Sequence, residues 1–118
     1  MQSTCDVTVR AMPGSVVLDL SGELNSSAAG VLLPAYEEAV RDGDPRTILI
    51  DFTKVDYINS TGIALVVGVL AKARTEGRSV VACGLTEHYR EIFTITRLSD
   101  FMQMYGDVNS ALGTLAGA

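Results

Sequence analysis

Residues 47–52, Thr-Ile-Leu-Ile-Asp-Phe, carry three apolar side chains in succession and a fourth at Phe52. Successive side chains of a strand point to opposite faces of a sheet, so a strand with this sequence has to be covered on both faces. The rest of the chain must therefore supply layers on two sides of a sheet. A chain of 118 residues can bury roughly two thirds of its unfolded surface, which predicts a single domain spanning residues 1–118.

The remaining segments predict strands that alternate with helices. Residues 5–11 and 16–21 alternate between apolar and polar positions around a Pro-Gly-Ser turn, as a β-hairpin does. The expected helices cover 27–41, 61–75, 86–95 and a short segment after Asp107, and the further strands cover 79–84 and 101–105, with a loop at 53–60. This order predicts an α/β domain in which a mostly parallel core and an N-terminal hairpin form one mixed sheet with helices packed on it.

Charge and cysteine content exclude several classes of protein. Nine Lys and Arg against fourteen Asp and Glu give a net charge of -5, which argues against binding to nucleic acid or to an anionic membrane surface. The longest strongly apolar run, 63–71, is far shorter than the roughly 20 residues that span a bilayer. Cys5 and Cys83 are too few for a disulfide framework, and the first residues lack the pattern of a signal peptide. We therefore expect a soluble cytoplasmic protein with free thiols.

The segment with most chemical information is 50–65, in which Asn59-Ser60-Thr61-Gly62 follows the buried strand and opens a helix. Hydroxyl groups at this position face free backbone N–H groups and the positive end of the helix dipole. The simpler interpretation is that Asn59 or Ser60 only caps the helix, which is worth about 1 kcal/mol. The other is that the hydroxyls carry a function.

The helix expected at 61–75 favours the functional interpretation, because it is apolar nearly all round. Its apolar and small side chains form two stripes, one of Ile63, Val66, Val67 and Leu70 and one of Thr61, Ala64, Leu65 and Gly68. A helix that covers a sheet should be polar on its outer side. This helix is therefore either covered by other elements or offers a docking surface with Ser60 at its rim.

The residues of this region resemble a known family. Asp51-Phe52 followed by residues 57–65 (Tyr-Ile-Asn-Ser-Thr-Gly-Ile-Ala-Leu) is similar to the core motif of STAS domains, above all the bacterial anti-sigma-factor antagonists. Residues 20–25, Leu-Ser-Gly-Glu-Leu-Asn, look like the Gly-Glu-Leu-Asp turn of that family. Length and element order agree as well, so the resemblance covers essentially the whole chain.

The resemblance implies a binding partner and a modification. In the family, the antagonist binds an anti-sigma factor that is also a serine kinase of the GHKL type, and this frees a sigma factor. The kinase phosphorylates a serine at the start of the helix, and a PP2C-type phosphatase reverses the reaction. The match places this serine at Ser60, with Thr61 as the second candidate, and implies a partner surface made of Asn25, Asn59, Ser60, Thr61, Ala64, Leu65 and Gly68.

This sequence departs from the family pattern at two positions. Asn59 stands immediately before the serine and Asn25 at the end of the turn, where the family usually has Asp. Both changes keep the size and the hydrogen-bonding capacity of the side chain and remove its charge.

Two other functions stay open at this point. The chain could be the STAS subunit of an ABC-type lipid-transport or other signalling assembly, in which Ser60 is never modified. It could also be a small hydrolase with Ser60 as nucleophile, which needs a base, but the single histidine, His88, lies on a different predicted helix. We expect His88 on the surface, Cys83 in the core, and Asp51 and Asp56 as separate carboxylates at the end of a strand. We expect no metal, no organic cofactor, and a monomer or weak homodimer.

Overall fold

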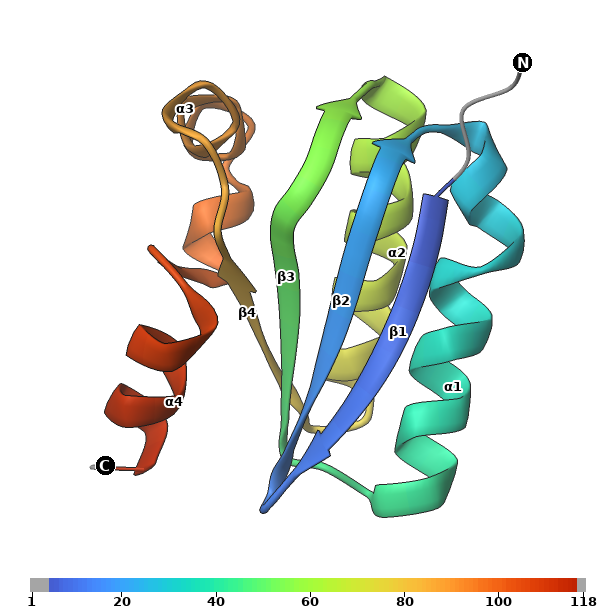
Figure 1. The fold of residues 1–118 in the computed structure, drawn as a ribbon, viewed down its shortest axis with the longest axis vertical. Coiled ribbons are helices and arrows are strands. Elements are labelled where there is room, and N and C mark those ends of the chain that lie inside the picture. Colours follow the sequence, from blue (N-terminus) through green and yellow to red (C-terminus); the bar gives the residue numbers. More distant parts are fainter. Residues whose placement is uncertain (1–4, 117–118) are drawn as a thin grey trace.

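The computed structural model describes residues 5–116, and within them five strands form one mixed sheet in the order β1-β2-β3-β4-β5 (Figure 1). The strands are β1 (Cys5–Met12), β2 (Ser15–Leu24), β3 (Thr47–Ile58), β4 (Ser79–Cys83) and β5 (Gln103–Tyr105). Strands β1 and β2 are antiparallel, whereas every later neighbour is parallel. The predicted N-terminal hairpin and parallel core are confirmed.

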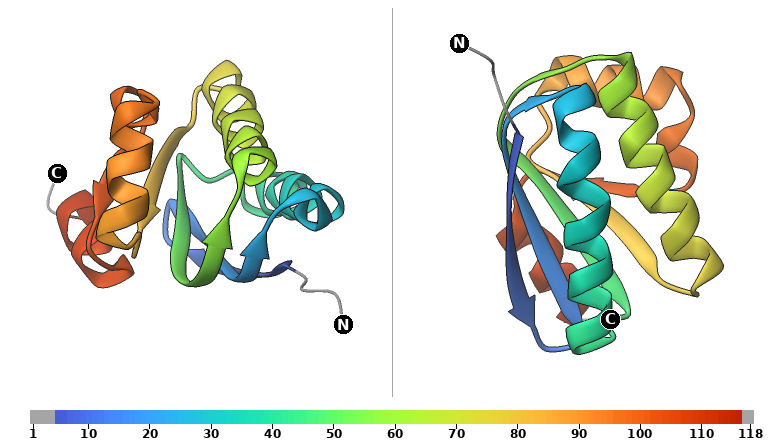
Figure 2. Two further views of the ribbon diagram at one scale, coloured as in Figure 1. Left: turned by 90° about the horizontal axis from the view of Figure 1, so that it is seen from above. Right: turned by 90° about the vertical axis from the view of Figure 1, so that its right-hand side faces the viewer.

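The helices of this span cover the two faces of the sheet unequally. They are α1 (Leu32–Gly43), α2 (Ser60–Thr75), α3 (Glu87–Ile95) and α4 (Val108–Ala116), with 3-10 turns η1 (Ser26–Gly30) and η2 (Leu98–Asp100). The parallel strands follow one another in sheet order, and right-handed crossovers between them place every connecting helix on the same face. Helices α1, α2 and α3 accordingly contribute to the larger core cluster, whereas α4 packs on the opposite face (Figure 2).

Strand β3 lies at the centre of both cores, as its sequence predicts. Ile48, Ile50 and Phe52 belong to the larger cluster, and Phe52 meets Phe93 of α3 edge to face with 5.8 Å between ring centroids. Leu49 points the other way, into the smaller cluster with Ala111 of α4. Ile48, Leu49, Ile50 and Phe52 are all buried.

Several predicted boundaries are wrong. The strand expected at 16–21 continues to Leu24, through residues that the sequence had predicted as a turn. The helix expected at 27–41 is interrupted: η1 ends at Gly30, Val31 has a non-helical backbone, and α1 begins at Leu32. The loop expected at 53–60 is strand as far as Ile58, because the ten residues of β2 continue to pair with it through two register shifts. Long-range pairing therefore decides the conformation of a segment that has no strong strand pattern of its own.

A polar cluster joins α1 to the turn between α2 and β4. The buried Tyr36 donates its hydroxyl hydrogen bond to Glu76 Oε1 at 2.5 Å, and Arg78 donates to the carbonyl of Pro45 and contacts Asp44 at 2.8 Å. Burial, with the bond to Glu76, raises the pKa of Tyr36 to about 12, and the same bond lowers the pKa of Glu76. The cluster holds together the end of the domain that is opposite to the start of α2.

We expect Tyr36→Phe to lower the free energy of unfolding by about 1 kcal/mol at pH 7, because it removes one hydrogen bond and keeps the buried ring. A carboxyl group whose pKa is lower in the folded state than in the unfolded state stabilises the fold at pH values above its unfolded pKa. This stabilisation is lost as the pH falls through the folded-state pKa. Without its donor the pKa of Glu76 rises, so the variant should lose less stability than the native protein between pH 7 and about pH 3. Urea unfolding measures both effects, and Tyr57→Phe, at an exposed ring, is the control.

Candidate functional site

The two sequence motifs meet at the carboxyl ends of β2 and β3. Glu23 pairs with Tyr57 and Leu24 with Ile58, so that residues 22–25 lie beside the start of α2. The backbone N–H of Asn59 donates to the carbonyl oxygen of Leu24 at 3.2 Å. Two segments far apart in the sequence therefore form one continuous surface.

Gly62 permits the close approach of α2 to the end of β2. A Cβ atom built at Gly62 would lie 1.9 Å from the carbonyl oxygen of Leu24, which is backbone and cannot rotate away. Any larger residue must therefore push the first turn of α2 off the end of β2. The glycine of the Ser-Thr-Gly motif is thus explained by packing between the two motifs.

Asn59, and not Ser60, caps α2. Its backbone is extended, and its Oδ1 accepts a hydrogen bond from the N–H of Gly62 at 2.9 Å. Ser60 is the first helical residue, one position before the predicted start, and its side chain is exposed, as is that of Thr61. Within residues 5–116 neither hydroxyl has a hydrogen-bond partner, so capping does not account for either of them.

Asn25 shapes the turn on the other side of the site. Its Oδ1 accepts hydrogen bonds from the N–H of Ser27 at 2.9 Å and from the Ser27 hydroxyl at 2.7 Å. Its Nδ2 donates to Glu23 Oε1 at 3.3 Å. An aspartate at position 25 would place a second carboxylate beside Glu23. The neutral amide of Asn25 instead donates a hydrogen bond to the Glu23 carboxylate. No sequence pattern indicates this role of Glu23.

The exposed side of α2 is made of small and apolar residues. Ala64 and Gly68 lie on it as predicted, and Val67 joins them with 42 % of its surface exposed. We call Ser60, Thr61, Ala64, Val67, Gly68 and Ala71 the α2 outer face; all six are exposed. Leu65, also predicted for this surface, is half-buried and packs against the larger core, so only part of its side chain is exposed beside this face. A helix that is apolar all round gives no sequence signal for its rotation, which explains why Val67 was missed.

The remaining sequence candidates lie elsewhere. His88 is exposed on α3 and stacks edge to face on Tyr89, with 5.0 Å between ring centroids. Cys83 is buried as expected, and burial raises the pKa of its thiol to about 12. Asp51 accepts a hydrogen bond from the N–H of Thr53 at 3.0 Å, whereas Asp56 is exposed further along β3.

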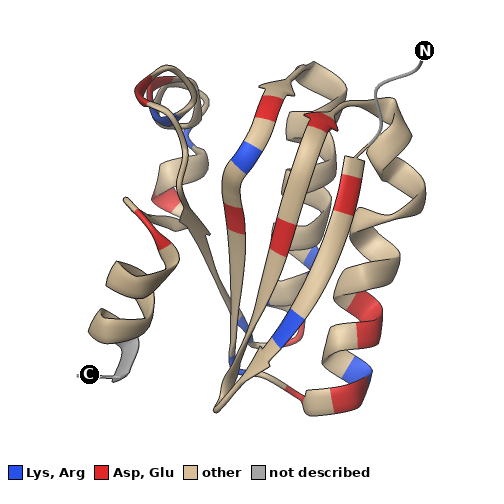
Figure 3. Cartoon of the chain, viewed as in Figure 1, with Lys and Arg blue, Asp and Glu red and all other residues tan. Residues whose placement is uncertain are grey.

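Neither metal ligands nor a membrane-spanning helix are found in the described part of the chain. No three His, Cys, Asp or Glu side chains of residues 5–116 are grouped so as to hold a metal ion. None of the helices described for these residues has the length and apolar composition needed to cross a membrane. Lys and Arg residues are distributed over several helices and strands of this span (Figure 3).

Comparison with known proteins identifies the family of the chain. The family model described as "Mlab, STAS domain" matches residues 7–105. The chain is 32% identical to BtrV of Bordetella bronchiseptica, named as a candidate anti-sigma factor antagonist, over 88% of this chain and 86% of that protein. The crystal structure of an anti-sigma factor antagonist from Mycobacterium paratuberculosis is 26% identical, with a TM-score of 0.74 over 94% of this chain and 93% of that one.

A third comparison concerns the fold alone. SpoIIAA, a Bacillus cell fate determinant solved in its phosphorylated form, is 21% identical and superimposes with a TM-score of 0.73 over 93% of this chain and 99% of that one. Together with the family match, these likenesses show that the chain is a STAS domain. Within that class it belongs to the family of anti-sigma-factor antagonists.

Two glycines of α2 provide a matched test of the contact between the motifs. We expect Gly62→Ala to lower the free energy of unfolding by about 1–3 kcal/mol, the usual cost of overpacking. Gly68→Ala should instead raise it by about 0.5–1 kcal/mol, because nothing lies within 4 Å of a Cβ there and alanine favours the helix. Urea unfolding of both variants measures the difference. Equal effects at the two positions would contradict the packing argument.

Proposed function

We propose that this protein frees a sigma factor by binding an anti-sigma factor in the cytoplasm, and that it acts as a regulatory binding protein and not as an enzyme. The observation that carries the proposal is the single surface formed by the α2 outer face and residues 22–25. Its small side chains let a partner approach the helix closely, and their apolar character favours a desolvated contact. The names of the relatives support the same function.

We further propose that phosphorylation of Ser60 switches this binding off. The Ser60 hydroxyl is exposed, is not used for capping, and lies at the rim of the α2 outer face. A phosphoserine carries roughly -1.5 to -2 charges at pH 7. At a helix N-terminus this charge is favourable by about 0.3–1 kcal/mol, so the fold should tolerate it. A docked partner would have to remove water from the phosphate, and a penalty of about 3 kcal/mol weakens binding roughly a hundredfold.

The neutral residues around Ser60 are compatible with this switch. Asn59 caps the helix with its amide oxygen and adds no negative charge beside an incoming phosphoryl group. The base and the metal for phosphoryl transfer come from the kinase, so a carboxylate at position 59 is not required for the chemistry. We propose a GHKL-type serine kinase as the anti-sigma factor and a PP2C-type phosphatase as the enzyme that restores the active form.

The two rival functions make different demands on Ser60. A hydrolase needs a base hydrogen-bonded to its nucleophile, and no side chain of residues 5–116 bonds to the Ser60 hydroxyl. A subunit of a lipid-transport assembly would use the same surface without modification of Ser60. Phosphate incorporation therefore separates the antagonist from both alternatives.

We expect a serine kinase from the same organism, purified and supplied with labelled ATP, to phosphorylate the native protein and not Ser60→Ala. Thr61→Ala, the matched control, should be phosphorylated like the native protein. Ser60→Ala should bind the kinase constitutively. Ser60→Asp should bind it at least roughly tenfold more weakly while it keeps a near-native melting temperature. Equal labelling of Ser60→Ala and native protein would show that Ser60 is not the phosphate acceptor, and Thr61 would be the next candidate.

Ala64→Lys tests the surface independently of phosphorylation. A lysine on the α2 outer face must lose water when a partner docks, so the affinity for the kinase should fall by roughly tenfold to a hundredfold. Stability should change little, because Ala64 is exposed. Thr114→Lys, on the exposed side of α4, is the control. Unchanged affinity of Ala64→Lys would show that the partner binds elsewhere; Leu65→Lys is unsuitable, since Leu65 packs on the core.

A further inference from the structure

Strand β1 is an open edge of the sheet. In the strand order of the described residues it pairs with β2 on one side and has no neighbouring strand on the other. An edge strand offers a row of unpaired backbone N–H and C=O groups to another strand. Val9, in the middle of β1, is exposed to 39 %.

The side chains of β1 separate into a polar and an apolar row. Pairing with β2 places Val7 opposite Leu20 and Val9 opposite Leu18, on the side of the larger core. Asp6, Thr8 and Arg10 alternate with them and therefore point to the other face. On that face the Arg10 Nε donates to Asp19 Oδ2 at 2.5 Å.

Residues 6–10, Asp-Val-Thr-Val-Arg, are complementary to themselves in an antiparallel pair. When Thr8 of one copy faces Thr8 of a second, each Val7 faces a Val9 and each Asp6 faces an Arg10. Residues directly opposite share a face, so both valine pairs lie on the apolar side and both ion pairs on the polar side. A register shifted by one residue in each strand would place Val9 opposite Val9. Arg10 would then face Thr8, and both ion pairs would be lost.

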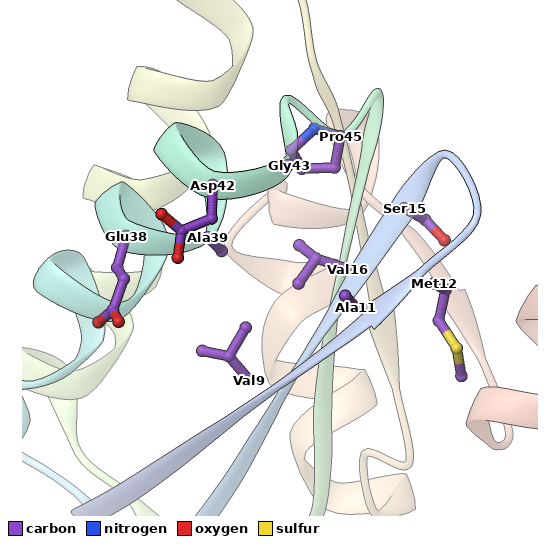
Figure 4. A pocket seen from close by; sticks show the side chains of 10 residues that line it. All are labelled: Val9, Ala11, Met12, Ser15, Val16, Glu38, Ala39, Asp42, Gly43 and Pro45. Atoms are coloured by element: carbon purple, nitrogen blue, oxygen red, sulfur yellow. The ribbon is translucent and has the colours of Figure 1, made fainter.

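A pocket beside β1 adds to this argument. It has a volume of about 340 Å³ and lies between β1 and the end of α1, with Val9, Val16 and Ala39 as apolar lining (Figure 4). Glu38 and Asp42 of α1 line it on the other side. In the register described above, Val7 of a second copy stands beside Val9 and covers apolar surface that is otherwise exposed.

We propose that two copies of this protein associate through β1 into a dimer with one continuous sheet. The occupant of the edge is a second copy because the charges and the valines match under a twofold axis at Thr8. Asp19 engages only two of the five N–H donors of Arg10, which leaves donors for Asp6 of the second copy. Helix α1 lies between β1 and α2, so the α2 outer face stays accessible in both copies (Figure 2).

Sedimentation equilibrium of the full chain up to about 1 mM tests the dimer. We expect a concentration-dependent monomer–dimer equilibrium in the native protein. Thr8→Lys places two ammonium groups at the axis and should weaken association by roughly fivefold or more, because like charges directly opposite are destabilising. Thr114→Lys is the matched control and should associate like the native protein. A native protein that stays monomeric throughout, or a dimer unaffected by Thr8→Lys, would overturn the proposal.

A cysteine at the axis tests the register. Residue 8 is the one position of β1 that faces itself, so Thr8→Cys should form a disulfide-linked dimer under mild oxidation. Thr114→Cys, which carries the same buried Cys5 and Cys83, should form no disulfide-linked dimer. Equal cross-linking of the two variants would exclude the proposed register. The test needs neither a kinase nor phosphorylation, so its result is independent of the proposed switch at Ser60.

Discussion

The close contact between Gly62 and the carbonyl of Leu24 connects the sheet to the site. Parallel pairing of β2 and β3 continues to Leu24 and Ile58, and α2 starts directly against the end of β2. The hydrogen bond from Asn59 to Leu24 and the cap from Asn59 to Gly62 both depend on this approach. Because the atom that Gly62 approaches is a backbone oxygen, no rearrangement of side chains could make room for a larger residue at position 62. The exposure of Ser60 and the position of the α2 outer face follow from this contact.

The electrostatics of the site depend on two neutral residues. Asn25 both accepts from Ser27 and donates to Glu23, which a carboxylate could not do, whereas Asn59 only accepts a hydrogen bond from Gly62. The first turn of α2 carries no acidic side chain either. A phosphate at Ser60 would be the main negative charge introduced there, so a single modification changes the local field strongly.

The order of the strands separates the surfaces of the domain. Three connecting helices on one face leave the second face to α4, which covers β3, β4 and β5. The edge at β1 lies beyond α1, while α2 presents its outer face away from the sheet (Figure 2). A regulatory partner and a second copy of the chain can therefore bind different parts of one small domain.

Much of the fold could be predicted from local sequence. The buried strand at 47–52, the hairpin and the helix after Asn59 have patterns that depend on neighbouring residues, and the structure confirms them. The extension of β3 to Ile58 could not be predicted, because it depends on pairing with β2. The break at Val31 was also missed, since helical periodicity continues across it.

The sequence by itself determined the main parts of the candidate site: the Ser-Thr-Gly motif, residues 22–25 and a helix without a polar side. Only the tertiary structure decided that Asn59 and not Ser60 caps α2, that Leu65 packs on the core while Val67 is exposed, and why position 62 has to be glycine. The physical reason is that these properties depend on the rotation of α2 and on its distance from β2. Both are set by packing between segments far apart in the chain, which a local pattern of residues does not specify.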